Sequence, residues 1–111
     1  MMTRLTWTAL TLSAGVLLAT MFSEQVRSDD KSAAVYKQKC ASCHGPDGKG
    51  DTPAGKATKV RSFADPEVVK MSDEELAEVI EKGKGKMPKY GATLKPDEIK
   101  AMVAHIRTLV K

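Results

Sequence analysis

Two cysteines and a histidine stand together in a chain that has no other cysteine, in the order Cys40-Ala41-Ser42-Cys43-His44. The spacing C-x-x-C with His as the next residue is typical of covalent haem c attachment. One helical turn brings both sulfurs to the same side, where they can react with the two vinyl groups of one porphyrin. The pattern therefore predicts one haem c bound through Cys40 and Cys43, with His44 as the proximal iron ligand.

Three other kinds of site also use closely spaced cysteines. A thioredoxin-like redox pair needs a βαβ context, which the sequence does not show. A structural zinc site needs four ligands, and His105 is the only further Cys or His after residue 28. A simple disulfide accounts neither for His44 nor for the shortage of large core residues. Each of these alternatives explains fewer features than haem c does.

A haem iron with one histidine ligand has a sixth position, and four residues could fill it. The candidates are Met71, Met87, Met102 and His105. Met102 falls on an apolar helical stripe and suits a core, and Met71 precedes a helix start, where it can pack onto that helix. Met87 lies in Gly-Lys-Gly-Lys-Met-Pro, residues 83–88, which has no helical or strand periodicity to bury it. We therefore predict Met87 as the second axial ligand.

The periodicity of the remaining chain predicts three helices joined by long loops. A first helix is expected over residues 31–40, with Asp29-Asp30 as its N-cap, and residues 45–62 are expected to be irregular because they are rich in Gly and Pro. Ser72 and Glu75 form a capping-box pattern at the start of a helix that ends at Gly83. Pro96 opens a last helix, whose apolar stripe is Ile99, Met102, Val103, Ile106 and Val110. With no strand-like alternation, the sequence predicts an all-α protein.

Composition adds a division of the chain into a leader and one domain. The 111 residues carry a net charge of +4 and are 29% charged, which excludes a polytopic membrane protein and an acidic disordered tail. Residues 5–22 contain no charge and follow Arg4, as in a secretory leader, and we place cleavage after Ser28. The prediction is a signal peptide over 1–28 and one domain over 29–111, exported to a bacterial periplasm. An uncleaved membrane anchor is the alternative.

Removal of this leader would also remove the only tryptophan. Residues 29–111 then keep Tyr36, Phe63 and Tyr90 as their only aromatic residues. A domain this small with so few large rings is marginal without a further group in its core. A covalently bound haem would supply that missing volume.

Over residues 31–111 the chain resembles the small monohaem class I c-type cytochromes. The resemblance rests on Cys40-x-x-Cys43-His44, on Met87-Pro88 and on the last helix, residues 99–109. It implies a fold of three to four helices with long loops around one haem, in which the terminal helices cross. Ser32 and Ala33 stand near the place where the family often has Gly. The family usually has an aromatic at the position of His105, so His105 is expected to pack against Tyr36.

The resemblance also leaves the surroundings of the haem to be assigned. Many members hold a haem propionate with Trp, for which Arg61, Tyr90 or a backbone amide could substitute. The Nδ1–H of His44 is expected to donate to a backbone carbonyl, with that of Pro53 as the candidate.

The expected function is single-electron transfer rather than catalysis. A thioether ligand favours ferrous iron, and two filled axial positions exclude oxygen and peroxide, so the iron would cycle between Fe(II) and Fe(III). No nucleophile–base pair or carboxylate dyad is apparent, so the chain is not expected to be an enzyme. The alternatives are a membrane-anchored electron-transfer subunit of a larger redox complex, and a haem-based gas sensor or small peroxidase.

The distribution of charge predicts the kind of partner. Lysines surround Met87 and flank the attachment motif, whereas acidic residues are concentrated on the preceding helix. The lysines are Lys82, Lys84, Lys86 and Lys89 in the first group and Lys37, Lys39 and Lys49 in the second. We expect a monomer that docks on acidic surfaces of a redox donor and acceptor and that binds no nucleic acid.

Overall fold

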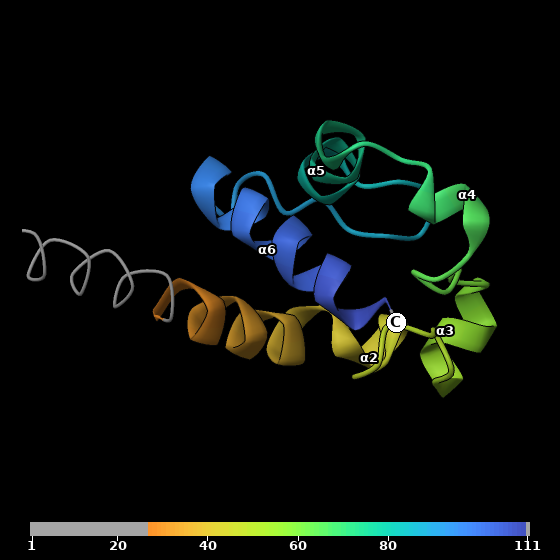
Figure 1. Ribbon diagram of the computed structural model, residues 1–111. Helices are drawn as coiled ribbons and strands as arrows, with labels where there is room; N and C mark the ends of the chain where they lie inside the picture. The colour runs from red at the N-terminus through yellow and green to blue at the C-terminus, as the bar shows by residue number, and fades with distance from the viewer. Residues whose placement is uncertain (1–26, 111) are drawn as a thin grey trace, which may run out of the picture.

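The structure is a computed structural model that describes residues 27–110, and this part of the chain is helical with long connections (Figure 1). Residues 27–39 form the first helical segment. It is followed by α2 (Ala41–His44), α3 (Pro53–Thr58), α4 (Pro66–Val69), α5 (Asp73–Lys82) and α6 (Pro96–Leu109). The described residues contain no β-strand, only an isolated bridge between Lys84 and Met87. The all-α prediction is therefore confirmed.

The core lies where the three longer helices meet, and α6 runs between the 27–39 segment and α5 (Figure 1). Helix α6 contributes half of its buried side chains, and Met102, only 1% exposed, is the most deeply buried of them. Burial of one such side chain contributes roughly 1.5–3 kcal/mol. The core residues are Tyr36, Leu76, Ile80, Leu94, Ile99, Met102, Val103 and Ile106. The apolar stripe predicted for the last helix is thus the face that packs, except that Val110 lies at its C-terminal cap.

Two helix starts follow the sequence closely. At α5 the Ser72 hydroxyl accepts a hydrogen bond from Glu75 N (3.1 Å), and the Glu75 carboxylate accepts one from Ser72 N (2.7 Å). This is the predicted capping box. At α6, Pro96 occupies the first turn and the Glu98 carboxylate accepts from Lys95 N at 2.9 Å. Both helices are therefore fixed at their N-termini by local sequence.

The first helix begins earlier than predicted. Asp29 and Asp30 lie within it rather than capping it, because residue 27 is already helical and neither Gly nor Pro interrupts residues 27–30. The Ser32 hydroxyl donates to Ser28 O at 2.9 Å. The predicted leader, residues 1–28, lies outside the described residues except for positions 27 and 28. Within residues 27–110, no helix combines the length and the hydrophobicity needed to cross a membrane.

Two short helices were not predicted, and α3 lies in the stretch that we expected to be irregular. Each starts with a polar N-cap followed by proline, namely Thr52-Pro53 for α3 and Asp65-Pro66 for α4. The Thr52 hydroxyl accepts from Gly55 N at 2.9 Å. This pattern of a polar cap followed by proline was present in the sequence, but the many Gly and Pro residues nearby favoured an irregular stretch.

The first and last helices contact each other through side chains that the sequence indicated. The rings of Tyr36 and His105 lie 5.2 Å apart between centroids, as predicted. Of the two small residues considered for this contact, Ser32 is buried and Ala33 is exposed. Lys31 of the first helix forms an ion pair with Glu98 of α6.

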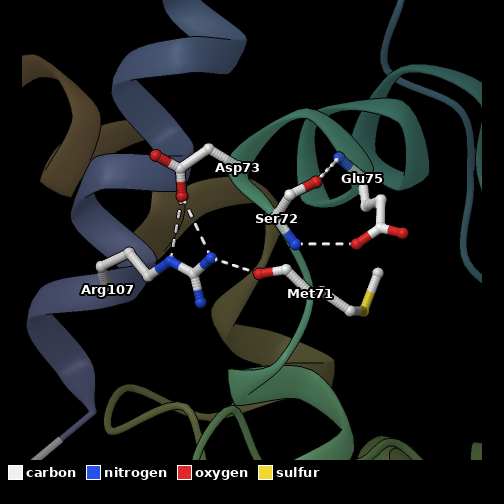
Figure 2. A network of polar contacts seen from close by, with 5 residues as sticks. All are labelled: Met71, Ser72, Asp73, Glu75 and Arg107. Carbon is white, nitrogen blue, oxygen red and sulfur yellow. Dashed lines mark hydrogen bonds and ion pairs between the residues drawn. The ribbon is translucent and has the colours of Figure 1, made fainter.

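Arg107 connects the other end of α6 to the start of α5 (Figure 2). Its Nη2 donates to Met71 O at 2.6 Å, and its Nε donates to the Asp73 carboxylate at 3.1 Å. Met71 directly precedes the Ser72 cap, so one guanidinium contacts the residues on both sides of this N-cap. This fixes the position of α5 relative to α6.

Candidate haem site

The attachment motif occupies the turn of helix that follows the first helical segment. Cys40 is the N-cap of α2 and His44 is its last residue. Cys40 O accepts from His44 N at 2.9 Å, so both ends of the motif are joined by a helical hydrogen bond. Cys40 and Cys43 are free thiols, each partly exposed. The structure therefore places the three motif residues on a single turn with both sulfurs available.

Every carbonyl from Lys39 to Gly45 accepts a hydrogen bond in this structure. Local amides satisfy Cys40 O and Ala41 O, as in any helix. The others accept from donors outside the turn. Two tyrosine hydroxyls bond to its ends: Tyr90 Oη donates to Lys39 O at 3.1 Å, and Tyr36 Oη donates to Gly45 O at 2.7 Å. Thr52 Oγ1 donates to Ser42 O (2.8 Å) and Cys43 O (3.0 Å), and Gly50 N donates to His44 O at 2.7 Å. Separate parts of the chain thus hold the motif in place.

Helix α3 lies unusually close to the motif. A Cβ on Gly55 would stand 2.3 Å from Cys43 O and 2.4 Å from Gly50 O, so only glycine fits there. Thr52 is placed between the two helices, because its hydroxyl accepts from Gly55 N and donates to the C-terminal carbonyls of α2. The α3 start and the α2 end are therefore held by one side chain.

The imidazole of His44 stacks on Phe63. The ring centroids lie 4.8 Å apart and the planes differ by 21°. Phe63 in turn meets Tyr36 edge to face at 6.4 Å. Burial lowers the pKa of His44, so the ring is neutral near pH 7, the form that binds metals. Phe63 was noted in the sequence only as an aromatic residue, and no local pattern joined it to His44.

The predicted hydrogen bond from His44 Nδ1 to a backbone carbonyl is absent. Nδ1 is buried and has no partner among the described residues. Pro53 opens α3, so its carbonyl enters the hydrogen-bond pattern of that helix instead. A buried ring nitrogen without a partner costs about 1–3 kcal/mol.

These features fit a covalently bound haem. Burial raises the pKa of Cys40, which keeps its sulfur as a thiol. Both thiols are unpaired, and the imidazole of His44 is neutral near pH 7. The donor set consists of two sulfurs for the vinyl groups and one imidazole for iron, which is what haem c attachment needs.

Met87 lies at the turn of a closed loop. Gly83 N, Tyr90 N and Gly91 N donate to the carbonyls of Val79 (2.8 Å), Ile80 (2.9 Å) and Glu81 (3.0 Å), so both ends of the loop join the end of α5. Gly83 has φ +73°, and a Cβ there would stand 2.6 Å from Met87 O. Met87 N donates to Lys84 O at 3.0 Å. The fold therefore presents Met87 on a defined turn.

The other candidates for the sixth position have different surroundings. Met102 is fully buried in the core, as the sequence indicated, and His105 packs against Tyr36. Met71 packs against the core and lines a cavity of about 310 Å³ that Gly83 and Lys84 also line. Met87 and Cys40 are both partly buried at the border of the core, although no hydrogen bond or ring contact joins Met87 to His44 within residues 27–110.

Lysines around the loop and the motif are exposed. Lys82 pairs with Glu78 at 2.8 Å. Lys84, Lys86 and Lys89 form no ion pair with any residue of the described part of the chain. The same is true of Lys37, Lys39 and Lys49. The predicted positive surface is therefore largely uncompensated, with Lys82 as the exception.

Comparison with known proteins gives a consistent result. Residues 27–106 match the family model for cytochrome c oxidase, cbb3-type, subunit III. A solved structure named KustC0563 c-type cytochrome is 38% identical, with a TM-score of 0.66, and the match covers 72% of this chain and 98% of that one. No curated protein matches the chain. The chain therefore belongs to the c-type cytochromes, with the all-α class I fold, covalently bound haem c and a function in haem-based electron transfer.

Proposed function

We propose that this protein is a single-electron carrier in which Cys40 and Cys43 hold the haem and His44 and Met87 are its axial ligands. The observation that supports this most directly is the α2 turn, which carries two free thiols and a neutral imidazole. When bound, the haem supplies one-electron exchange between Fe(II) and Fe(III). The chain has the task of holding, orienting and covering it.

Each site residue has a separate role in this proposal. The Cys40 and Cys43 thiols would hold the haem as thioethers, each formed by addition of S–H across one vinyl group without an oxidant. The imidazole of His44 is kept from rotating by its stacking on Phe63. The thioether of Met87 is a soft, neutral donor, which raises the reduction potential and keeps external ligands out.

The test is a redox and spectral study of the purified holoprotein. We expect covalent haem, a titration that fits one electron, and the weak ferric band at the red end of the visible spectrum that Met–Fe coordination produces. Ferric protein without this band that binds cyanide or carbon monoxide at once would instead indicate a gas sensor or small peroxidase.

Residues 1–28 are proposed to be a secretory leader, with the carrier formed by residues 29–111 in a bacterial periplasm. The uncharged run after Arg4 supports this. N-terminal sequencing of the exported protein is the test, and Asp29 is the expected first residue. A product that keeps residues 1–28 and stays with the membrane fraction would contradict it.

The proposed partners are redox proteins with acidic docking surfaces, and the carrier is proposed to be a monomer. The exposed lysines Lys84, Lys86 and Lys89 on the Met87 loop support docking on acidic surfaces. Steering of this kind raises the association rate and weakens as salt screens it, with a Debye length of about 8 Å at physiological ionic strength. Changing Lys84 and Lys86 to Glu should slow the bimolecular oxidation with little change in potential.

The matched control changes Lys56 and Lys100 to Glu, which alters the net charge equally but on α3 and α6. If both double variants slow the reaction equally, net charge rather than the loop surface is responsible. A rate that is indifferent to salt and to both variants would show that these lysines are only solvated.

The family description supports a second candidate. It names a subunit of an oxidase, so this chain could instead deliver electrons as one component of a larger membrane complex. Native gel analysis of the gently solubilised membrane fraction distinguishes the two. A free shuttle migrates as a small monomer, whereas a subunit migrates with a large haem-containing assembly.

A further inference from the structure

Tyr90 links the Met87 loop to the residue that precedes the attachment motif. Its hydroxyl donates to Lys39 O at 3.1 Å, across 51 positions of sequence. Lys39 is the neighbour of Cys40, so the bond ends beside the first attachment cysteine. Burial raises the pKa of Tyr90, which keeps the phenol protonated and able to donate.

The backbone of Tyr90 is itself held firmly. Its N–H donates to Ile80 O at 2.9 Å, and its carbonyl accepts from Thr93 N (3.0 Å) and Leu94 N (2.8 Å). The ring packs against the core. The backbone of Tyr90 is thus bonded to α5 and to the residues just before α6, and its hydroxyl is bonded to Lys39, beside the attachment motif.

The rest of the loop has few other connections. Between Gly83 and Tyr90 the internal bond is that from Met87 N to Lys84 O. Within residues 27–110, the Tyr90 hydroxyl makes the one side-chain hydrogen bond that joins residues 83–91 to another part of the chain. Gly83 and Gly85, both with positive φ, add no side chain that could pack.

We propose that Tyr90 is a positioning residue whose hydroxyl holds the Met87 loop against the attachment segment and thereby slows the departure of Met87 from iron. This inference rests on the proposed ligation by Met87. It goes beyond that ligation because it assigns the contact between the loop and Lys39, beside the attachment motif, to one hydrogen bond that can be removed without changing the ligand.

The experiment uses Tyr90→Phe holoprotein, which keeps the ring and loses only the hydroxyl. Loss of one hydrogen bond of ordinary strength should increase loop opening about three- to tenfold. Cyanide binding to the ferric protein under native conditions should therefore be about three- to tenfold faster, and amide hydrogen exchange of residues 83–89 should increase by a similar factor. The ferric Met–Fe band should persist at equilibrium.

Thr58→Val is the matched control, because Thr58 also donates a hydroxyl to a backbone carbonyl, Ala54 O at 2.8 Å, but on α3. It should leave both the cyanide rate and the exchange of residues 83–89 unchanged. The inference is overturned if Tyr90→Phe behaves like the unmodified protein, or if Thr58→Val accelerates both processes equally.

The two proposals fail in different ways. If the unmodified ferric protein lacks the Met–Fe band and Met87→Ala changes nothing, ligation by Met87 is wrong. If the band is present but Tyr90→Phe changes neither cyanide binding nor amide exchange, only the role of Tyr90 is wrong.

Discussion

Gly55 and Cys43 lie so close that a Cβ on the glycine would stand 2.3 Å from the cysteine's carbonyl oxygen. The same Cβ would also stand 2.9 Å from the Thr52 hydroxyl, which bonds to the end of α2 and to the start of α3. The position of α2, and with it the attachment motif, therefore depends on the absence of a side chain at residue 55. This contact involves backbone atoms, which cannot move aside as the end of a flexible side chain can.

Gly55→Ala should therefore destabilise the holoprotein by about 3 kcal/mol, the upper part of the usual range for overpacking. Gly85→Ala is the control, because Gly85 has open space around it and only the strain of its φ of +57°. That variant should cost about 1 kcal/mol. Denaturant unfolding measures both. Equal losses would show that α3 moves away from α2 easily.

The two attachment cysteines can be tested separately. Cys40→Ala or Cys43→Ala should leave one thioether and a protein that matures poorly, whereas the double variant should retain no haem after denaturation. Mass spectrometry of the unfolded chain counts the bonds. Covalent haem in the double variant would contradict attachment at these residues.

The axial methionine can be identified by comparing three alanine variants. Met87→Ala should lower the reduction potential and allow cyanide or carbon monoxide to bind readily. Met102→Ala should instead cost about 2–5 kcal/mol of stability, because this side chain is 1% exposed in the core. Met71→Ala is the control at the border of the core. If the reduction potential falls in Met102→Ala or in Met71→Ala but not in Met87→Ala, the axial ligand is the methionine whose variant has the lower potential.

Arg107 should contribute more through Met71 than through Asp73. Asp73→Ala removes an ion pair whose carboxylate is 70% exposed, which should cost less than about 1 kcal/mol. Arg107→Ala also leaves Met71 O without its donor at 2.6 Å, and should cost about 2 kcal/mol. Urea unfolding of the two variants gives the comparison. Similar losses would show that the bond to Met71 contributes little.

The ion pair between the first and last helices should make stability depend on pH in acid. The hydrogen bond from Lys31, aided by Lys95 N, holds the pKa of Glu98 below its usual 4.5. Between the pKa of Glu98 in the folded chain and its value of 4.5 in the unfolded chain, the unfolded chain binds more protons. The stabilisation by this ion pair is therefore complete above pH 4.5 and is lost as the pH falls through the folded-state pKa of Glu98. Glu98→Gln should be less stable than the unmodified protein near pH 7 and equally stable in strong acid.

Lys31→Gln serves as the control for this experiment, because it removes the ion-pair partner of Glu98 and leaves the carboxylate in place. In that variant the part of the stability that is lost in acid should shrink. A stability difference between Glu98→Gln and the unmodified protein that does not change with pH would show that the pair with Lys31 does not persist in solution.

The features that could be predicted from sequence were those with a local cause. The capping box of Ser72 and Glu75, the start of α6 at Pro96 and the buried stripe of α6 all follow from spacing within one helix. The starts of α3 and α4 were also local, since a polar cap precedes Pro in both, but the surrounding Gly and Pro outweighed that signal.

Features that depend on distant parts of the chain could not be predicted in this way. The stacking of Phe63 on His44 joins residues 19 positions apart through a loop whose path no spacing rule gives. The bond from Tyr90 to Lys39 and the unpartnered Nδ1 of His44 likewise depend on tertiary packing. The contact between Tyr36 and His105 was the exception, because the family resemblance supplied it.

The closed loop that carries Met87 is joined to α5 through backbone atoms alone, from Gly83 N, Tyr90 N and Gly91 N. Side-chain identity at most positions between these anchors has no part in the closure. Substitutions at the exposed positions of this segment can therefore change the charge of the surface beside Met87 while the register of the helices stays the same.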